Sequence, residues 1–366
     1  MLVVKKFGGT SVGNKDRIMN VAKRCIEDYK KGNDVVVVLS AMGKMTDELI
    51  AKAKEINPNP SRREMDMLLT TGEQTSVSLM AMAMDSLGVP AVSLNAFQVA
   101  MHTTSVYSNA RIKRIDTDRI MNELEQRKIV IVTGFQGVDQ FDNYTTLGRG
   151  GSDTTAVALA AALHADACEI YTDVDGIYTT DPRIEPKAKK LDKISYDEML
   201  ELASLGAKVL QNRSVEMAKK LNVNLVSRSS FTPEVEGTLI TKEENIMEKP
   251  IVSGIALDKN QVRVGMYGVT DKPGIAASIF TSLADENINV DMIVQTVGVD
   301  GKTDLDFTIP TTDLLICKNV MEKFKTQAEN IDYNEAICKV SIVGVGMKSH
   351  TGVASKAFTA LANENI

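Results

Sequence analysis

Short apolar runs alternate with amphipathic stretches over the first two-thirds of the chain. The runs consist mainly of Val, Ile and Leu, which is typical of strands buried on both faces of a sheet. Between them, residues 66–87 carry Met and Leu at helical spacing, and residues 196–221 also indicate helix. This alternation predicts an α/β fold with a largely parallel sheet sandwiched by helices. The expected strands are the start of the chain and residues 35–40, 91–94, 129–134, 169–172 and 225–228.

The first apolar run leads directly into a glycine turn. Gly8 and Gly9 lack a Cβ, so a ligand can approach the backbone closely at this point. A helix is expected just beyond them, and its N-terminus favours an anion. Thr10 or Ser11 is placed to cap that helix, and Lys6 adds a cation. The segment predicts a phosphate site, although its spacing is neither that of a Walker A loop nor that of a dinucleotide fingerprint.

A second glycine-rich turn, at residues 145–155, lies between an expected strand and an alanine-rich helix. It supplies Arg149, whose guanidinium can donate two parallel hydrogen bonds to a carboxylate or a phosphate. Two such turns, each with a cation and each opening a helix, indicate a ligand site at the carboxyl ends of the strands. Asp153 either orients Lys6 or caps a helix that starts at Thr154, and the sequence leaves both open.

The composition agrees with a globular enzyme. The 366 residues allow two or three domains, and 43% hydrophobic and 25% charged residues are globular values. The net charge of -6 gives no basic surface for nucleic acid. Four scattered cysteines indicate core residues in a reducing compartment and argue against zinc. Since no apolar run has the length of a membrane span and no signal peptide is found, we expect no membrane partner and a cytoplasmic location.

The last third of the chain contains an internal repeat. Residues 264–288 and 340–366 each read as a strand, a turn ending in glycine and an amphipathic helix. Both copies resemble the ACT module, a ferredoxin-like α+β unit of pattern βαββαβ that binds amino acids in many regulated enzymes. The second copy stops after its first helix, so we expect it to be truncated at Ile366. The matching apolar positions are Phe280, Leu283 and Ile288 in the first copy and Phe358, Leu361 and Ile366 in the second.

Motifs over the whole chain resemble those of the aspartate kinases of the amino-acid-kinase family. They lie at residues 6–12, 40–43, 46–49, 68–73, 134–137, 147–153, 171–178 and 181–183, in the family's order. The resemblance implies the amino-acid-kinase fold and transfer of the ATP γ-phosphoryl group to the β-carboxylate of L-aspartate, the first step of the lysine, threonine and methionine pathway. It also implies Mg²⁺ with the nucleotide, held chiefly by phosphates and water.

The resemblance assigns roles to individual residues. It implies Lys6 and Asp153 as catalytic residues. For ATP it implies Lys6, Phe7, Gly8, Gly9, Thr172, Asp173, Tyr178, Arg183 and Lys208. For aspartate it implies Ser40, Thr46, Glu73, Arg149, Gly150, Gly151 and Ser152, with Glu73 and Arg149 suited to opposite ends of an amino acid. Without the resemblance, Lys208 could equally be a solvated helix lysine. For Glu73 an ordinary helix glutamate is the less favoured alternative. Asp173 and Asp175 either bind a metal or shape a turn.

The ACT region implies feedback control by lysine, threonine or both. Candidate effector residues are Asp271, Asn289, Asp291 and Gln295. The turn from Asp271 to Gly274 enters a helix, so it offers a carboxylate for an ammonium and backbone N–H groups for a carboxylate. A plain type I or II turn with Pro at its second position is the alternative.

The expected domains are a catalytic domain at 1–240, a linker at 241–250, a first ACT-like module at 251–335 and the start of a second at 336–366. We expect a homo-oligomer that forms through the ACT modules. Met247 is a candidate start of a separate regulatory subunit, which implies a heterotetramer as the alternative.

Two other functions compete with this one. Another amino-acid kinase would act on a different carboxylate, a carbamate or a nucleotide, and the appended repeat argues against it. A non-catalytic amino-acid sensor would keep only a kinase-like shell. The presence of Lys6, Glu73, Arg149 and Asp153 together argues against a sensor.

Overall fold

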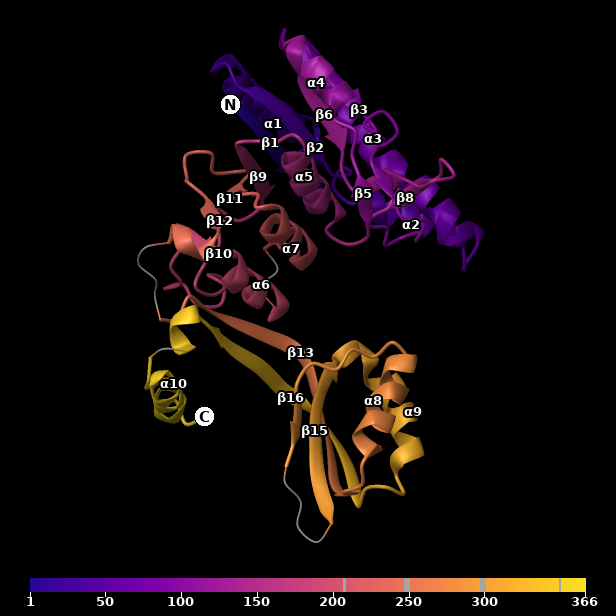
Figure 1. The fold of residues 1–366 in the computed structure, drawn as a ribbon, viewed down its shortest axis with the longest axis vertical. Helices are drawn as coiled ribbons and strands as arrows, with labels where there is room; N and C mark the ends of the chain where they lie inside the picture. The colour runs from indigo at the N-terminus through magenta and orange to yellow at the C-terminus, as the bar shows by residue number, and fades with distance from the viewer. Residues whose placement is uncertain (207–208, 247–250, 297–300, 349) are drawn as a thin grey trace. The chain divides into compact units, whose positions relative to one another are not determined.

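The computed structural model describes residues 1–206, 209–246, 251–296, 301–348 and 350–366. The chain forms two compact units, which are described separately (Figure 1). The first unit comprises Met1–Ile255 and Ile342–Ile366, and the second comprises Ala256–Ser341. No helix in these described ranges is both long enough and apolar enough to cross a bilayer.

An eight-stranded sheet forms the centre of the first unit. Neighbouring strands are parallel, except that β11 and β12 run antiparallel. Every strand expected from the apolar runs is present, which confirms the largely parallel sheet. In spatial order the strands are β10 (Lys193–Ser195), β12 (Thr238–Thr241), β11 (Leu225–Ser229), β9 (Ala167–Thr172), β1 (Leu2–Phe7), β2 (Asp34–Leu39), β6 (Ile129–Thr133) and β3 (Ala91–Leu94).

Helices cover both faces of this sheet. On one face, Val37 and Leu39 of β2 pack with Val21 of α1 (Lys15–Lys30) and with Val77 and Met80 of α3 (Arg62–Ser86). The other face is covered by α5 (Gly151–Ala162), which packs on β1 and on α7 (Asn212–Leu221). Shorter helices are α2 (Met45–Ile56), α4 (Asp118–Glu125) and α6 (Tyr196–Ser204).

Two local predictions are wrong. Asn14, rather than Thr10 or Ser11, caps α1, because the chain first makes a 3-10 turn over Gly9–Val12. The single helix expected over 196–221 is two helices, α6 and α7. Helix α6 ends at Ser204, and Gly206 has a φ of 121°, which a right-handed helix does not accommodate.

A smaller sheet of four short strands lies beside the main one in the first unit, with the order β5-β4-β7-β8. Strand β8 is antiparallel to β7 and contacts α3, and it leads directly into the second glycine-rich turn. This sheet therefore supports one wall of the ligand site described below. Its strands are β4 (His102–Thr103), β5 (Ile112–Arg114), β7 (Gln136–Val138) and β8 (Tyr144–Thr146).

The second unit is a ferredoxin-like α+β fold, as expected for an ACT module. Its four-stranded sheet has the order β14-β15-β13-β16, and α8 and α9 pack on one face around Val264, Phe307, Ile279 and Cys317. The elements in chain order are β13 (Gly254–Thr270), α8 (Ile275–Asp285), β14 (Ile293–Gln295), β15 (Lys302–Pro310), α9 (Leu314–Met321) and β16 (Asn330–Val343).

The internal repeat is visible in the structure. Gly274 before α8 and Gly352 before α10 (Val353–Asn363) both adopt a left-handed conformation, with φ of 98° and 88°. No residue of α10 is buried, whereas Leu283 of α8 is. The predicted domain limits stay predictions. Strand β16 runs without a break across the predicted limit between the two ACT-like modules at 335–336. Residues 247–250 of the expected linker, which include Met247, lie outside the described residues.

Candidate active site

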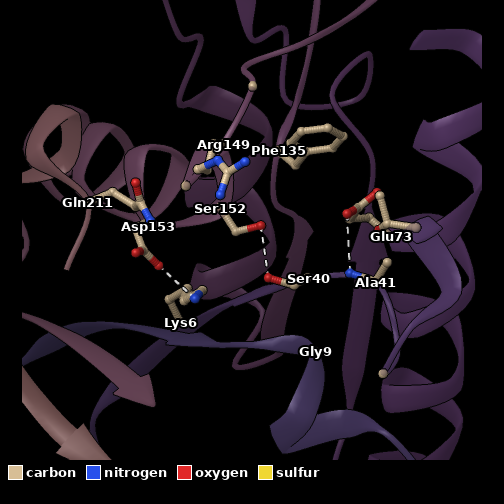
Figure 2. Close-up of a pocket in the computed structure, with 15 residues that line it drawn as sticks. Lys6, Gly9, Ser40, Ala41, Glu73, Phe135, Arg149, Ser152, Asp153 and Gln211 are labelled. Atoms are coloured by element: carbon tan, nitrogen blue, oxygen red, sulfur yellow. Dashed lines mark hydrogen bonds and ion pairs between the residues drawn. The ribbon is translucent and has the colours of Figure 1, made fainter. Parts of the chain in front are cut away.

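A cavity of about 350 Å³ opens at the carboxyl ends of β1 and β2. It contains both residues expected to be catalytic and all seven expected to bind aspartate (Figure 2). The structure therefore brings together motifs that are more than 100 residues apart in the sequence. The lining residues are Lys6, Gly9, Ser40, Ala41, Gly43, Thr46, Glu73, Phe135, Gly148, Arg149, Gly150, Gly151, Ser152, Asp153 and Gln211.

The two residues expected to be catalytic lie on one side of the cavity. Lys6 Nζ is 2.6 Å from Asp153 Oδ1, and both side chains are about nine-tenths buried. The pair forms because side chains alternate along β1, so that Lys6 faces α5 while Lys5 faces α1. The N-cap position of α5 belongs to Gly150, and Asp153 pairs with Lys6 from the first turn of that helix.

Glu73 lies on the opposite side of the cavity from this pair (Figure 2). Its side chain comes from the middle of α3 and is only 3% exposed. The backbone N–H of Ala41 donates to Oε1 at 3.2 Å, and Oε2 has no hydrogen-bond partner in the described part of the chain. Burial raises the pKa of Glu73 to about 8, and the hydrogen bond from Ala41 opposes this shift. Once this side chain is ionised, its free oxygen can accept a cationic ligand.

Hydroxyl groups lie between these two sides. Ser40 Oγ donates to Ser152 Oγ at 2.9 Å, which joins the end of β2 to the first turn of α5. Thr46 lines the cavity from the first turn of α2. These hydroxyls can donate hydrogen bonds to the oxygens of a bound carboxylate or phosphoryl group.

Arg149 contributes an exposed guanidinium to the cavity. It stands between Gly148 and Gly150, which both have a positive φ, of 79° and 70°. A Cβ on Gly150 would lie only 2.0 Å from Cγ of Gln211, so the turn and the start of α7 are in close contact. The backbone that carries Arg149 is therefore held tightly, while its charged group is free to meet a ligand.

The residues expected to bind ATP are only partly gathered here. Lys6 and Gly9 line the cavity, and a Cβ on the neighbouring Gly8 would lie 3.6 Å from Lys6 Nζ. The Phe7 side chain is fully buried and stacks on Tyr171 with ring centroids 4.4 Å apart. Phe7 therefore offers a ligand its backbone and not its ring.

Four of the remaining nucleotide candidates, all among the described residues, do not line this cavity: Thr172, Asp173, Tyr178 and Arg183. The hydroxyl of Tyr178 donates to Asp175 at 2.8 Å, and Arg183 pairs with Asp181 at 2.8 Å. The first contact indicates that Asp175 shapes the turn before Gly176. Thr172 is the last residue of β9 and Asp173 follows it, at the same sheet edge, while Lys208 lies outside the described residues.

Sequence reasoning missed several lining residues: Ala41, Gly43, Phe135, Gly148 and Gln211. Most of them are neighbours of predicted residues and follow from the motifs at 40–43, 134–137 and 147–153. Gln211 is different, because it comes from the start of α7, about 60 residues beyond the turn that it contacts. The break between α6 and α7, which the sequence pattern did not indicate, places it there.

A second cavity of about 260 Å³ lies in the second unit. Asp271 and Gln295 line it, together with the turn at Lys272, Pro273 and Gly274 that enters α8. Asn289 and Asp291 are not among its lining residues, and Asp291 forms an ion pair with Lys339. Two of the four effector candidates thus share a cavity, and two do not.

Comparison with known proteins agrees with this geometry. Residues 1–226 match the model of the amino acid kinase family, and residues 264–323 and 340–366 match an ACT domain. The chain belongs to the amino acid kinase family. It is 59% identical to the aspartokinase of Helicobacter pylori (strain J99 / ATCC 700824) over 370 residues, which cover 100% of this chain and 91% of that protein. It is 52% identical to aspartokinase 2 of Bacillus subtilis (strain 168), covering 100% of this chain and 90% of that protein.

Solved structures of family members are similar throughout. Aspartokinase III of E. coli in complex with aspartate and ADP has a TM-score of 0.80 at 28% identity, covering 99% of this chain and 91% of that one. The same enzyme in complex with lysine and aspartate has a TM-score of 0.78 at 28% identity, covering 94% and 87%. Function and fold predicted from the motifs are confirmed: this family member is an aspartate kinase with C-terminal ACT modules.

Proposed function

We propose that the cavity at the carboxyl ends of β1 and β2 is where this kinase transfers the γ-phosphoryl group of ATP to the β-carboxylate of L-aspartate. The observation that carries the proposal is that one cavity holds a cation beside a glycine turn, a buried glutamate with one oxygen unpartnered in the described part of the chain, and an exposed arginine. A carboxylate acceptor is already ionised at neutral pH and needs no general base. Accordingly, no histidine lines the cavity in the described part of the chain.

Aspartate binds with its two ends held by opposite charges. The free Oε2 of Glu73 accepts hydrogen bonds from the α-ammonium, and the guanidinium of Arg149 binds a carboxylate with two parallel hydrogen bonds. The hydroxyls of Ser40, Thr46 and Ser152 and the backbone at Gly150 and Gly151 complete the substrate site.

Lys6 acts on the transferring phosphoryl group. Phosphoryl transfer depends on positioning and on neutralisation of charge more than on covalent help, and a fixed ammonium supplies both. Asp153 holds that ammonium at 2.6 Å. The backbone at Phe7, Gly8 and Gly9 approaches the phosphates.

The rest of the nucleotide lies towards the end of β9. There we place its contacts with Thr172, Asp173, Tyr178 and Arg183, and with Lys208. Mg²⁺ accompanies ATP, bound mainly by phosphate and water oxygens. The carboxylate of Asp153 and the hydroxyls of Ser40 and Ser152 are oxygen donors of the kind that this ion prefers, and the ion neutralises phosphate charge when bound.

Truncation of the two charged groups tests the substrate site. Glu73→Ala and Arg149→Ala are each expected to raise KM for aspartate by about tenfold to a hundredfold, because each removes a charge-assisted hydrogen bond. KM for ATP is expected to change by less than about twofold. Initial rates of ADP release with each substrate varied in turn measure both constants. Glu64→Ala on the exposed face of α3 is the matched control. An equal loss for ATP and aspartate would indicate a folding defect and contradict the assignment.

The raised pKa of Glu73 predicts a pH dependence. Glu73 must be ionised to bind an ammonium, and its pKa in the free enzyme is about 8. We therefore expect kcat/KM for aspartate to rise by about tenfold per pH unit below that value and to level above it.

Since the folded pKa lies above the usual value, Glu73 also lowers the stability of the fold as pH rises from about 4.5 to about 8. A profile without this rise in wild type, or with the same rise in Glu73→Gln, would contradict the role of Glu73.

Feedback control acts through the second cavity. An effector amino acid, lysine or threonine, places its ammonium on Asp271 and its carboxylate on the N–H groups at the start of α8. Asp271→Ala is expected to abolish inhibition while leaving the uninhibited kcat within about twofold. Inhibition curves with lysine and threonine, singly and together, measure this. Asn289 does not line the cavity, so Asn289→Ala is the control and should keep its inhibition if the effector binds in this cavity. Full inhibition of Asp271→Ala would place the effector site elsewhere.

Assembly and location follow as further proposals. We expect a homo-oligomer that forms through the ACT modules, with a heterotetramer containing a separate regulatory subunit from Met247 as the alternative. Sedimentation of the purified protein distinguishes the two. A cytoplasmic location fits an enzyme that uses ATP and stays a prediction.

A further inference from the structure

Asp66 is a fully buried carboxylate outside the substrate site. It lies near the start of α3, and its side chain has no exposed surface. Oδ2 accepts hydrogen bonds from the backbone N–H groups of Ser108 and Thr146, both at 2.8 Å. Oδ1 accepts from the hydroxyls of the same two residues, at 3.1 and 2.9 Å. Four donors from two distant segments thus converge on one carboxylate. All four lie outside α3, so Asp66 ties other parts of the chain to this helix.

Both segments support the turn that carries Arg149. Thr146 is the last residue of β8, three positions before Arg149. Ser108 has a φ of 67°, a conformation that is unfavourable for serine and persists only where neighbouring groups hold it. A Cβ on Gly148 would lie 2.9 Å from the carbonyl oxygen of Ser108, so the turn rests directly on this residue. Asp66 therefore fixes the surface against which the arginine turn packs.

The turn is also held from the side of α7. Arg213 donates to the carbonyl oxygens of Leu147 and Ala110, both at 2.6 Å. Ala110 in turn donates its N–H to the carbonyl oxygen of Thr146 at 2.9 Å. Together with the hydrogen bonds to the Asp66 carboxylate, these contacts surround the base of the turn at Thr146 and Leu147.

Asp66 and Glu73 belong to the same helix. They are seven residues apart, or about two turns, so they lie on the same face of α3. The first turns of this helix bind the two segments that support the arginine turn, and its middle presents the Glu73 side chain for the substrate ammonium. The helix thereby sets the separation between Glu73 and Arg149.

We infer that Asp66 is a positioning residue that holds Arg149 at the distance from Glu73 which an aspartate molecule spans. The inference rests on the proposed roles of Glu73 and Arg149. Loss of Asp66 should release Ser108 and the end of β8, and the guanidinium would then sample positions that do not match the substrate. A misplacement of about 1 Å is enough to weaken such a site by up to about a hundredfold.

The test is a double-mutant cycle on the full chain with Asp66→Asn, Arg149→Ala and both together. Asp66→Asn keeps the shape of the side chain, and we expect it to raise KM for aspartate by about tenfold or more, with KM for ATP within about twofold. In the Arg149→Ala background it should have no further effect on kcat/KM for aspartate, because the group through which it acts is gone. The matched control is Asp139→Asn, because Asp139 is also buried and accepts hydrogen bonds from backbone N–H groups, here those of the β7–β8 turn. This variant should not raise KM for aspartate more than KM for ATP.

The outcomes are distinguishable. If Arg149→Ala weakens aspartate but Asp66→Asn does not, or if the two losses multiply, Asp66 is only structural and the inference is overturned while the substrate site stands. If Arg149→Ala itself leaves aspartate unaffected, the substrate site and the inference fail together. Should Asp66→Asn not fold, Ser108→Ala and Thr146→Val each remove one hydroxyl donor. Smaller increases in KM for aspartate that vanish in the Arg149→Ala background support the inference, and unchanged values overturn it.

Discussion

Replacing Lys6 by Met is expected to lower kcat by about a thousandfold, with much smaller changes in KM for ATP and aspartate. The γ-phosphoryl group carries its charge on several oxygens in the transition state, so a fixed ammonium stabilises that state more than the bound substrates. Lys6 is suited to this because Asp153 holds its Nζ at 2.6 Å inside the cavity. Methionine has nearly the shape of the lysine stem but lacks the ammonium, so the charge and its three N–H donors are lost together. Release of ADP at saturating substrates measures the change.

The Lys6 variant needs one control, because it leaves the carboxylate of Asp153 buried without its partner. The double variant Lys6→Met with Asp153→Asn removes that stranded charge. If the melting temperature of the double variant returns to that of wild type, the stranded charge accounts for any loss of stability in Lys6→Met, and low activity of Lys6→Met at a temperature where that single variant is fully folded is due to the missing ammonium. Near-normal turnover in Lys6→Met would remove Lys6 from the mechanism.

The fold was largely predictable because the composition and length of the apolar runs indicate buried strands without knowledge of their partners. Residues 35–39 are almost pure Val and Leu, and such a run has few stable places other than a strand buried between two layers of helices. Once the strands are parallel, their carboxyl ends meet at one edge, and motifs that follow different strands must lie close together. The cavity that joins Lys6, Ser40 and Arg149 follows from this rule.

Features that depend on distant partners were not predictable. Whether Glu73 is an ordinary helix residue or a buried carboxylate depends on what covers α3 at that point. The contact of Gln211 with the arginine turn depends on a helix break that leaves no clear mark in the hydrophobic pattern. Asp66 lies in a stretch of helical periodicity like any exposed acid, and only tertiary structure brings four donors to it.

Lys5 is a further case, since the motif at residues 6–12 assigns a role to Lys6 but says nothing of the partners of Lys5. On the opposite face of β1 it is 1% exposed, with Nζ 2.5 Å from Asp28 Oδ2 and 2.8 Å from Glu169 Oε2. Although burial works against both charged forms, the Lys5–Glu169 pair raises the pKa of Lys5 and holds the pKa of Glu169 below its usual range. Arg228 binds the other oxygen of Glu169 at 3.0 Å. The two adjacent lysines therefore have different tasks, one in the core and one in the cavity.

Lys5→Met is expected to lower the free energy of unfolding by about 3 kcal/mol at neutral pH, because it leaves buried carboxylates without their central cation. The matched control is Lys31→Met. Lys31 pairs with the same Asp28 at 3.1 Å but is 69% exposed, so its loss should change stability by less than about 1 kcal/mol. Urea unfolding of both variants at equal protein concentration measures these differences.

The pH dependence separates loss of charge from loss of packing. The pKa values of Asp28 and Glu169 are lowered in the fold, so their contribution is present above their usual pKa values and is lost as pH falls through the folded ones. The raised pKa of Lys5 keeps its charge throughout that range. The stability difference between wild type and Lys5→Met should therefore shrink as pH falls from neutral to below the usual pKa values of these carboxyl groups and they take up protons. A difference that stays constant over this range would mean that Lys5 stabilises the sheet through its methylene groups, and the ion pairs would then have no net role in the stability of the core.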